Sequence, residues 1–202
     1  MPSKGQKRKN LIIDTAKLMF IEKGYQSTHI GQICDELDIA RGTVYQYFGN
    51  KREIIYSILE TMEETFQDIF DIDSLTEFIE TNPNHEAMEN FIADRYSNCV
   101  KAVISEPIII MLLYKEIVGL DEEVIERTEL FLDRITKTIC RDLDMLKEKG
   151  VYRNNFDSNL IATLILGSVQ LIIHEYKKRS RDMLDIVVVK DVVDLIMKGI
   201  MA

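Results

Sequence analysis

The segment IGQICDELDIARGTVYQYF, residues 30–48, decides the fold of this chain. Its first half repeats apolar residues at spacings of three and four, which predicts a two-turn helix with one apolar face: Ile30, Ile33, Cys34 and Leu37. Asp38 follows, and Asp tolerates the left-handed backbone that a tight turn often needs. A further short helix is expected over residues 40–48. Two short helices joined by such a turn make a helix-turn-helix unit.

Helices are also predicted on either side of this unit. Residues 9–23 carry an apolar stripe, and Gly24 is a stop signal; the stripe consists of Ile12, Ala16, Met19 and Phe20. Ser27 or Thr28 is expected to cap the next helix by accepting a backbone N–H. After the unit, Asn50 is expected to cap a helix that begins at Lys51, with Glu53 at the spacing of a capping box.

The helix over residues 40–48 has an inner and an outer face. At about 100° per residue, Val44 and Phe48 lie together and are expected to face the core. Gly42 and Gln46 then point outward, flanked by hydroxyl side chains. Periodicity alone also allows the aromatic residues of this helix to be core residues: Tyr45, Tyr47 and Phe48.

The outer face has the chemistry of a helix that lies in the major groove of DNA. Gly42 lets the backbone approach closely, and Arg41 can bind guanine through two hydrogen bonds. The hydroxyls of Thr43 and Tyr45 suit phosphate oxygens. Lys51 stands where the N–H groups and the dipole of the next helix also favour a phosphate.

The charge of the chain is divided between its two ends. The formal net charge of −9 counts against DNA binding when taken alone, because affinity for DNA comes largely from basic residues. Residues 1–52 nevertheless carry nine Lys and Arg against five Asp and Glu, while residues 53–202 carry sixteen against twenty-nine. We therefore expect the basic head to meet DNA and the acidic remainder to stand clear of it.

The first residues carry much of that basic charge. A mobile arm that follows the DNA backbone or enters the minor groove is expected here, formed by Lys4, Lys7, Arg8 and Lys9. The alternative is a solvated tail without a partner.

Several other classes of protein are disfavoured. The three cysteines are widely spaced, which suggests neither a disulfide framework nor a zinc site. The polar start predicts no signal peptide, and the longest apolar stretch, residues 160–173, falls short of the roughly 20 residues of a membrane span. A cytoplasmic protein is expected. No HExxH, GxSxG or Gly-rich phosphate loop is found, so we expect no enzyme and no cofactor.

The remainder of the chain is predicted to form six helices, at residues 51–70, 86–105, 107–118, 121–149, 158–179 and 183–201, with a break at 81–84. Apolar and aromatic residues on these helices are candidates for a ligand cavity, with core packing as the alternative: Met62, Phe66, Tyr96, Met111, Tyr114 and Phe131. The last two helices are too apolar for a monomer surface. This favours a two-fold dimer interface over a central core helix, with Ala162, Ile165, Gly167, Val169, Ile172, Val189, Val193 and Ile196 as its residues.

The segment from Asn10 to Ser57, which contains IIDTAKLMFIEKGYQSTHIGQICDELDIARGTVYQYFGNKREII, resembles the N-terminal domain of the TetR family of bacterial transcription regulators. The resemblance implies an all-α homodimer. A three-helix DNA-binding head, residues 1–50, would precede a six-helix effector-binding and dimerisation body, residues 51–202, giving about nine helices. It also implies a repressor of a palindromic operator that a small apolar or amphipathic inducer releases.

The resemblance also implies DNA contact by Arg41, Gly42, Thr43, Tyr45, Gln46 and Lys51. Further candidates for DNA contact are Thr28, His29 and Tyr47 in the head, and Lys7 and Arg8 in the basic arm. Tyr47 matches a position that often touches phosphate, whereas its place on the helical wheel favours packing. His29 stands where Thr is usual, and either donates to phosphate or is simply exposed. Ala40 stands where a capping Ser is common, so that cap and its phosphate contact are not carried over.

Three functions compete on these observations. The first is a ligand-responsive repressor. The second is a DNA-binding architectural or accessory protein without an inducer, and the third is an enzyme that uses the helical body. The recognition helix on a basic head, joined to a larger apolar body, favours the first.

Overall fold

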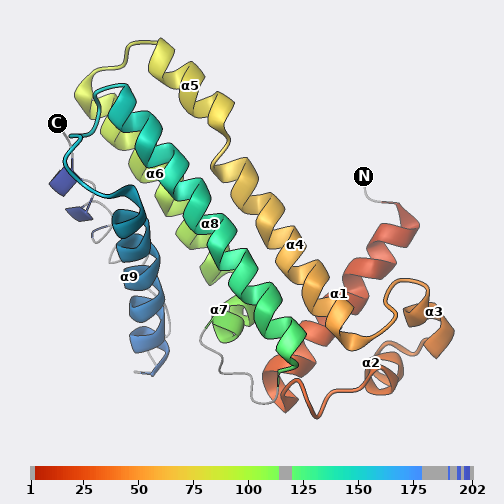
Figure 1. The fold of residues 1–202 in the computed structure, drawn as a ribbon. Coiled ribbons are helices and arrows are strands. Elements are labelled where there is room, and N and C mark those ends of the chain that lie inside the picture. Colours follow the sequence, from red (N-terminus) through yellow and green to blue (C-terminus); the bar gives the residue numbers. More distant parts are fainter. Residues whose placement is uncertain (1–2, 114–119, 179–190, 192–194, 197, 201–202) are drawn as a thin grey trace. The chain divides into compact units, whose positions relative to one another are not determined.

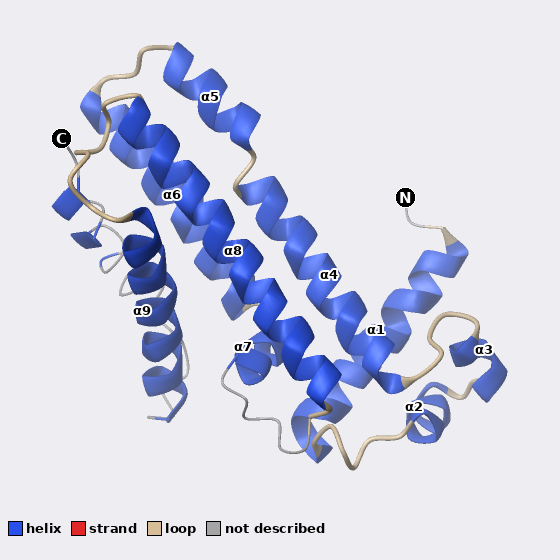
Figure 2. Cartoon of the chain, viewed as in Figure 1, coloured by secondary structure: helices blue, strands red, loops and turns tan. Residues whose placement is uncertain are grey.

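The computed structural model describes residues 3–113, 120–178, 191, 195–196 and 198–200. Within these residues the secondary-structure elements are nine helices (Figures 1 and 2). They are α1 (Lys4–Lys23), α2 (Ile30–Leu37), α3 (Arg41–Tyr45), α4 (Lys51–Ile69), α5 (Ile72–Glu80), α6 (His85–Ile104), α7 (Pro107–Leu113), α8 (Glu122–Glu148) and α9 (Ser158–Lys178). The predicted all-α fold is confirmed.

The chain forms two compact units. The head unit comprises Met1–Met62 and Pro107–Phe131, and the body unit comprises Glu63–Glu106 and Leu132–Ala202. The helix-turn-helix therefore shares its unit with the first part of α4, with α7 and with the start of α8. Within this unit α7 contacts α1.

The core of the head is built by the apolar faces that the sequence predicts. The residues of the predicted stripe on α1 are buried, as are Ile33 and Cys34 of α2 and Val44 of α3. α1 ends at Gly24, whose φ of 83° is a conformation that glycine adopts without strain. Asp38 takes the left-handed conformation expected of it, with φ and ψ both at 50°.

The start of α1 corrects one expectation. The helix begins at Lys4, because the Ser3 hydroxyl accepts the Gln6 N–H at 3.1 Å and caps it. The Gln6 side chain then donates to Asn10 one turn further on, at 2.8 Å. The basic residues predicted as a mobile arm, Lys4, Lys7, Arg8 and Lys9, therefore lie on the first turns of a helix.

The residue that caps α2 differs from the expected one, whereas the residue that caps α4 is the expected one. His29 is the N-cap residue of α2, in place of Ser27 or Thr28, and its backbone N–H donates to the Gln32 side chain at 2.7 Å. Asn50 caps α4 as predicted, because its side-chain oxygen accepts the N–H groups of residues 52 and 53. The Glu53 carboxylate turns back to accept the Gly49 N–H at 2.7 Å.

The body unit contains a helix that the sequence did not predict. α5 occupies the segment between α4 and the predicted break, and the Asp71 carboxylate caps it by accepting the Ser74 N–H at 2.8 Å. The break itself is confirmed, since Asn82 has a φ of 53° and Asn84 caps α6. Only a few residues of the predicted last helix, 183–201, lie among those described, and these are helical.

A buried ion pair holds α6 and α8 at the junction of α4 and α5. The Arg95 Nε donates to the Asp142 carboxylate at 3.0 Å, and both side chains are buried. The Arg95 and Arg141 guanidinium groups also donate to the carbonyl oxygens of Asp71 and Phe70, at 2.8 and 2.6 Å. Burial raises the pKa of Asp142, and Arg95 opposes that rise. The two arginines thus satisfy carbonyl groups at the end of α4.

Candidate nucleic-acid interface

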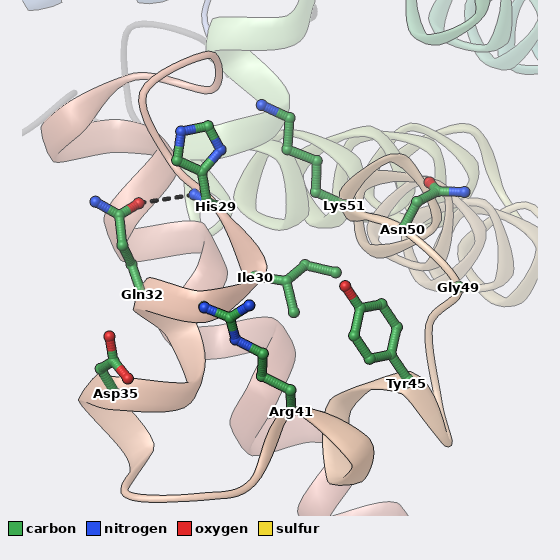
Figure 3. A pocket seen from close by; sticks show the side chains of 10 residues that line it. His29, Ile30, Gln32, Asp35, Arg41, Tyr45, Gly49, Asn50 and Lys51 are labelled. Carbon is green, nitrogen blue, oxygen red and sulfur yellow. Dashed lines mark hydrogen bonds between the residues drawn. The ribbon is translucent and has the colours of Figure 1, made fainter.

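A groove of about 550 Å³ opens on the head between α2, α3 and the start of α4 (Figure 3). Its walls carry basic, amide and hydroxyl side chains together with main chain, which are groups that meet phosphates and base edges, and also one carboxylate and one apolar side chain. The lining residues are His29, Ile30, Gly31, Gln32, Asp35, Arg41, Tyr45, Gly49, Asn50 and Lys51.

α3 presents the outer face that the sequence predicts. Val44 and Phe48 are buried, whereas Gly42 and Gln46 are exposed. Tyr45 is 54% exposed, so it is not the core residue that periodicity allowed. The regular helix is shorter than the predicted 40–48 and ends at Tyr45.

Space is open in front of Gly42. A Cβ built on this residue would meet no other atom within 4 Å. A nucleic acid backbone or base edge can therefore approach the α3 main chain closely at this point.

Arg41 lies across α2. Its Nη2 atom is 2.8 Å from the position that a Cβ on Gly31 would occupy, so a larger residue at 31 would displace the guanidinium. The side chains of Arg41 and Tyr45 both extend from α3 into the groove (Figure 3). Gly31 thus provides the surface on which the Arg41 guanidinium rests.

The first turns of α2 contribute a polar rim. His29, Gln32 and Asp35 are exposed and line the groove. Of these, sequence reasoning named only His29. The regular spacing of three along the outer side of α2 is the signal that could have identified Gln32 and Asp35.

Thr28 does not belong to the predicted DNA-contacting surface. Its side chain is fully buried, and its hydroxyl donates to the carbonyl oxygens of Gly24 at 2.8 Å and Met19 at 3.2 Å. Thr28 therefore fixes the end of α1 instead of facing a phosphate.

The remaining residues predicted to contact DNA differ in their exposure and in the groups that they contact. Lys7 is exposed on α1 and Arg8 is half-buried. Tyr47 is also half-buried, and its hydroxyl lies 3.7 Å from the position of a Cβ on Gly5, so it packs toward the start of α1. The Lys51 ammonium donates to the Tyr25 carbonyl oxygen at 2.7 Å, a partner that the sequence did not suggest.

A polar cluster joins the head to the start of α8 within the head unit. The buried Tyr25 hydroxyl donates to Asp121 at 2.9 Å, and the Arg52 guanidinium pairs with Glu123 at 2.6 Å. Burial and the Asp121 hydrogen bond raise the pKa of Tyr25 above its ordinary value. The segment before α8 is thereby attached to the connection between α1 and α2.

The predicted ligand residues fall in both units. Met62, Met111 and Phe131 belong to the head unit, and Phe66 and Tyr96 to the body unit. All of these except the half-buried Met111 are buried, and the Tyr96 hydroxyl has no hydrogen-bond partner among the described residues. Tyr114 lies outside the described residues, and a cavity formed by this set stays a prediction.

The predicted dimer residues on α9 need a correction. Ala162, Ile165 and Val169 are buried within the chain itself, so they cannot face a partner. The exposed side of α9 carries the predicted Gly167 together with Leu160, Leu164 and Leu171, which were not predicted. Of the other predicted residues, Ile172 and Ile196 are half-buried, and Val189 and Val193 lie outside the described residues.

None of the helices in the described part of the chain is long and apolar enough to cross a membrane.

Part of the chain is similar to a known family of regulators. Residues 12–58 match the family of bacterial regulatory proteins called the tetR family. The transcriptional regulator HbdR of Aromatoleum sp. (strain CIB) is 36% identical over 66 residues, which cover 33% of this chain and 29% of HbdR. A probable acrEF/envCD operon repressor of Escherichia coli K12 is 21% identical over 173 residues, covering 84% of this chain and 76% of that protein. The matched family and these relatives are described as regulators.

The fold is shared with solved regulators. The fatty acid degradation regulator FadR from Bacillus halodurans superposes with a TM-score of 0.72 at 18% identity, covering 95% of each chain. FadR from Bacillus subtilis, solved in complex with stearoyl-CoA, superposes with a TM-score of 0.70 at 19% identity, covering 95% of this chain and 98% of that one. These likenesses show that the chain shares its fold with these proteins.

Proposed function

We propose that this chain is a helix-turn-helix transcriptional regulator of the TetR family, and specifically a repressor that a small molecule releases from DNA. It binds a palindromic operator as a homodimer. Binding of the small molecule by the helical body weakens the hold of the head on the operator.

The exposed outer face of α3 carries the DNA-binding part of the proposal. Arg41 and Tyr45 extend into the groove, and the open space before Gly42 leaves room for a base edge. We assign base reading to Arg41 and Gln46, and phosphate contacts to Thr43 and Tyr45.

Phosphate contacts farther from α3 complete the proposed footprint. His29 at the start of α2 is exposed and able to donate to a phosphate oxygen. Lys7 and Arg8 face the DNA backbone from α1. We assign Tyr47 to packing within the head and not to a phosphate contact.

The exposed leucines of α9 support a homodimer. Leu160, Leu164 and Leu171 recur at spacings of four and seven, which places them on one side of the helix, and Gly167 between them lets a partner helix approach. A patch of this kind is costly to leave in water. We expect the two copies of α3 in such a dimer to bind successive half-sites about one DNA turn apart.

The effector we propose is amphipathic. The body unit buries aromatic side chains, among them the stacked pair Phe66 and Phe70 and the edge-on contact of Phe70 with Tyr96. An apolar chain suits such surroundings. The stearoyl-CoA held by a structurally similar regulator makes long-chain acyl-CoA the first compound to test. The acidic charge of residues 53–202 favours a cationic headgroup instead, so a quaternary ammonium amphiphile is the matched competitor.

The test starts from DNA that the protein itself selects. The wild-type chain is used to recover binding sites from a random-sequence duplex pool, and fluorescence anisotropy measures its affinity for the recovered duplex, hereafter the selected duplex. We expect a palindromic site, and we expect stearoyl-CoA or the cationic amphiphile, below its micellar concentration, to dissociate the complex. Recovery of a site that neither amphiphile weakens would contradict amphipathic release while leaving DNA binding in place.

A further inference from the structure

The Lys51 ammonium lies in a cup of main-chain oxygens on the connection between α1 and α2. Its Nζ atom donates to the carbonyl oxygens of Tyr25 at 2.7 Å, Thr28 at 3.3 Å and Gln26 at 3.4 Å. It also lies 4.1 Å from the centre of the Tyr25 ring. A lysine ammonium has three donors, so these three oxygens occupy its hydrogen-bonding capacity. Burial lowers the pKa of Lys51, as expected for a charge withdrawn from water.

The connection that Lys51 holds leads directly into the groove. Residues 25–28 precede His29, the N-cap residue of α2. The first turn of α2 carries Gly31, on which the Arg41 guanidinium rests. A displacement of residues 25–28 would therefore move the start of α2 and, with it, the surface that supports Arg41.

The rest of this connection is already fixed from the other side. The Thr28 hydroxyl binds carbonyl oxygens at the end of α1, and the Tyr25 ring packs against Phe20 with 5.3 Å between the ring centres. Lys51 supplies the attachment to α4. Without the Lys51 ammonium, the described hydrogen bonds between residues 25–28 and the first turn of α4 would be lost.

We propose that Lys51 is a positioning residue for the DNA-reading side chains: its ammonium fixes residues 25–28, and through them the start of α2 and the seat of Arg41, in place of contacting a phosphate. This inference rests on DNA binding by the head and does not depend on release by an effector.

Two substitutions separate positioning from phosphate contact. K51M keeps the length of the side chain but removes its charge and donors. K51R keeps the charge, and arginine binds phosphate at least as well as lysine does, but its planar guanidinium does not match a cup built around a compact ammonium. Affinity for the selected duplex is measured at several salt concentrations. K7M, at an exposed lysine of α1 assigned to the DNA backbone, and K23M, at an exposed lysine in the last turn of α1, are the matched controls.

Positioning predicts that K51M weakens binding by roughly tenfold, because the charge-assisted bonds that hold the connection are removed. The slope of log Kd against log salt stays at the wild-type value, and K51R does not restore the affinity. K7M, in contrast, lowers the slope by about 0.9 for each phosphate that the protein no longer neutralises, and K23M changes neither quantity. A K51M slope lowered by that amount together with wild-type binding by K51R would overturn the proposal, as would wild-type binding by K51M. Should K51M lack a helical circular dichroism spectrum, K51R alone decides.

A second measurement needs no DNA. Amide hydrogen exchange of residues 25–31 is compared between wild type, K51M and K23M. Positioning predicts faster exchange in K51M only, because a connection without its attachment opens more often. Equal exchange in all three proteins would overturn the proposal. If the wild-type chain recovers no DNA site, the proposed function fails, and the exchange experiment still tests the role of Lys51.

Discussion

The proposed recognition of a DNA sequence depends most on Arg41. It extends from α3 into the groove, and its guanidinium rests on Gly31. Among the described residues, no other arginine lines the groove. A guanidinium held in this way can present two donors to the O6 and N7 atoms of a guanine.

We expect R41A to weaken binding to the selected duplex by about 1–3 kcal/mol and to relax the preference at one base position in each half-site. The measurement is competition anisotropy with a set of single-base variants of the duplex. A uniform loss of affinity over all the variants would show that Arg41 contacts phosphate and does not read a base.

Thr28 illustrates the opposite case, a polar residue that supports the head from within. T28V replaces the buried hydroxyl by a methyl group of similar size and leaves the Gly24 and Met19 carbonyl oxygens without this donor. We expect the free energy of unfolding to fall by about 1–3 kcal/mol, and the folded protein to keep its DNA affinity. Urea unfolding and anisotropy measure the two quantities.

S27A is the control for T28V, since Ser27 is exposed and should tolerate the change. Unchanged stability in T28V, with a loss of DNA affinity, would return Thr28 to the DNA-contacting surface.

The start of α8 is joined to the α1–α2 connection by the bond from Tyr25 to Asp121. We expect Y25F and D121N each to destabilise the chain, and the double variant to lose less than the sum. A coupling energy of about 1 kcal/mol is expected, because the bond has a charged acceptor that water partly reaches. Urea unfolding of the four proteins measures it, and full additivity would show that the bond contributes nothing.

The same bond predicts a pH dependence. Because the pKa of Tyr25 is raised in the folded chain above its ordinary value of 10.0, the stabilisation is fully present below pH 10.0 and is lost as the pH rises beyond it. The stability difference between wild type and Y25F should therefore stay constant from pH 7 to 9 and shrink above pH 10. A difference that grows over that range would contradict this assignment.

The helices show which features of the fold can be predicted from the amino-acid sequence and which cannot. The inner and outer faces of α3 were predictable, because Val44 and Phe48 alternate clearly with exposed residues. The start of α1 was not, because the apolar stripe begins only at Ile12 and the first turns are held by Ser3 and by polar pairs. α5 was not predicted from the sequence, because its nine residues lie directly before the helix break at residues 81–84.

α9 and Lys51 show two further limits. α9 is apolar on most of its circumference, so periodicity could not tell the side buried in the chain from the side that carries Leu164. The role of Lys51 depends on carbonyl oxygens more than twenty residues earlier in the sequence. Contacts to main-chain atoms cannot be predicted from the pattern of side chains in the sequence.

The whole protein is expected to act as a dimer, and the exposed leucines of α9 provide the test. L164E places a charge in the centre of the proposed interface, so we expect it to convert the dimer to a monomer with the single-chain mass of 23.4 kDa. Light scattering during size-exclusion chromatography measures the mass. Binding to the palindromic duplex should fall as well, because each half-site is then bound separately.

L18E is the matched control, because Leu18 is exposed on α1 in the head unit. It should remain a dimer. A wild-type chain that is itself monomeric at micromolar concentration and on DNA would exclude the α9 interface.

The central claim is that the outer face of α3 reads a DNA sequence. The most direct measurement compares the Kd of the wild-type chain for the selected duplex with its Kd for a scrambled duplex of the same composition, at physiological salt. We predict at least a roughly 10³-fold preference for the selected duplex, which R41A reduces by about 1–3 kcal/mol. Equal affinity for both duplexes would contradict the account.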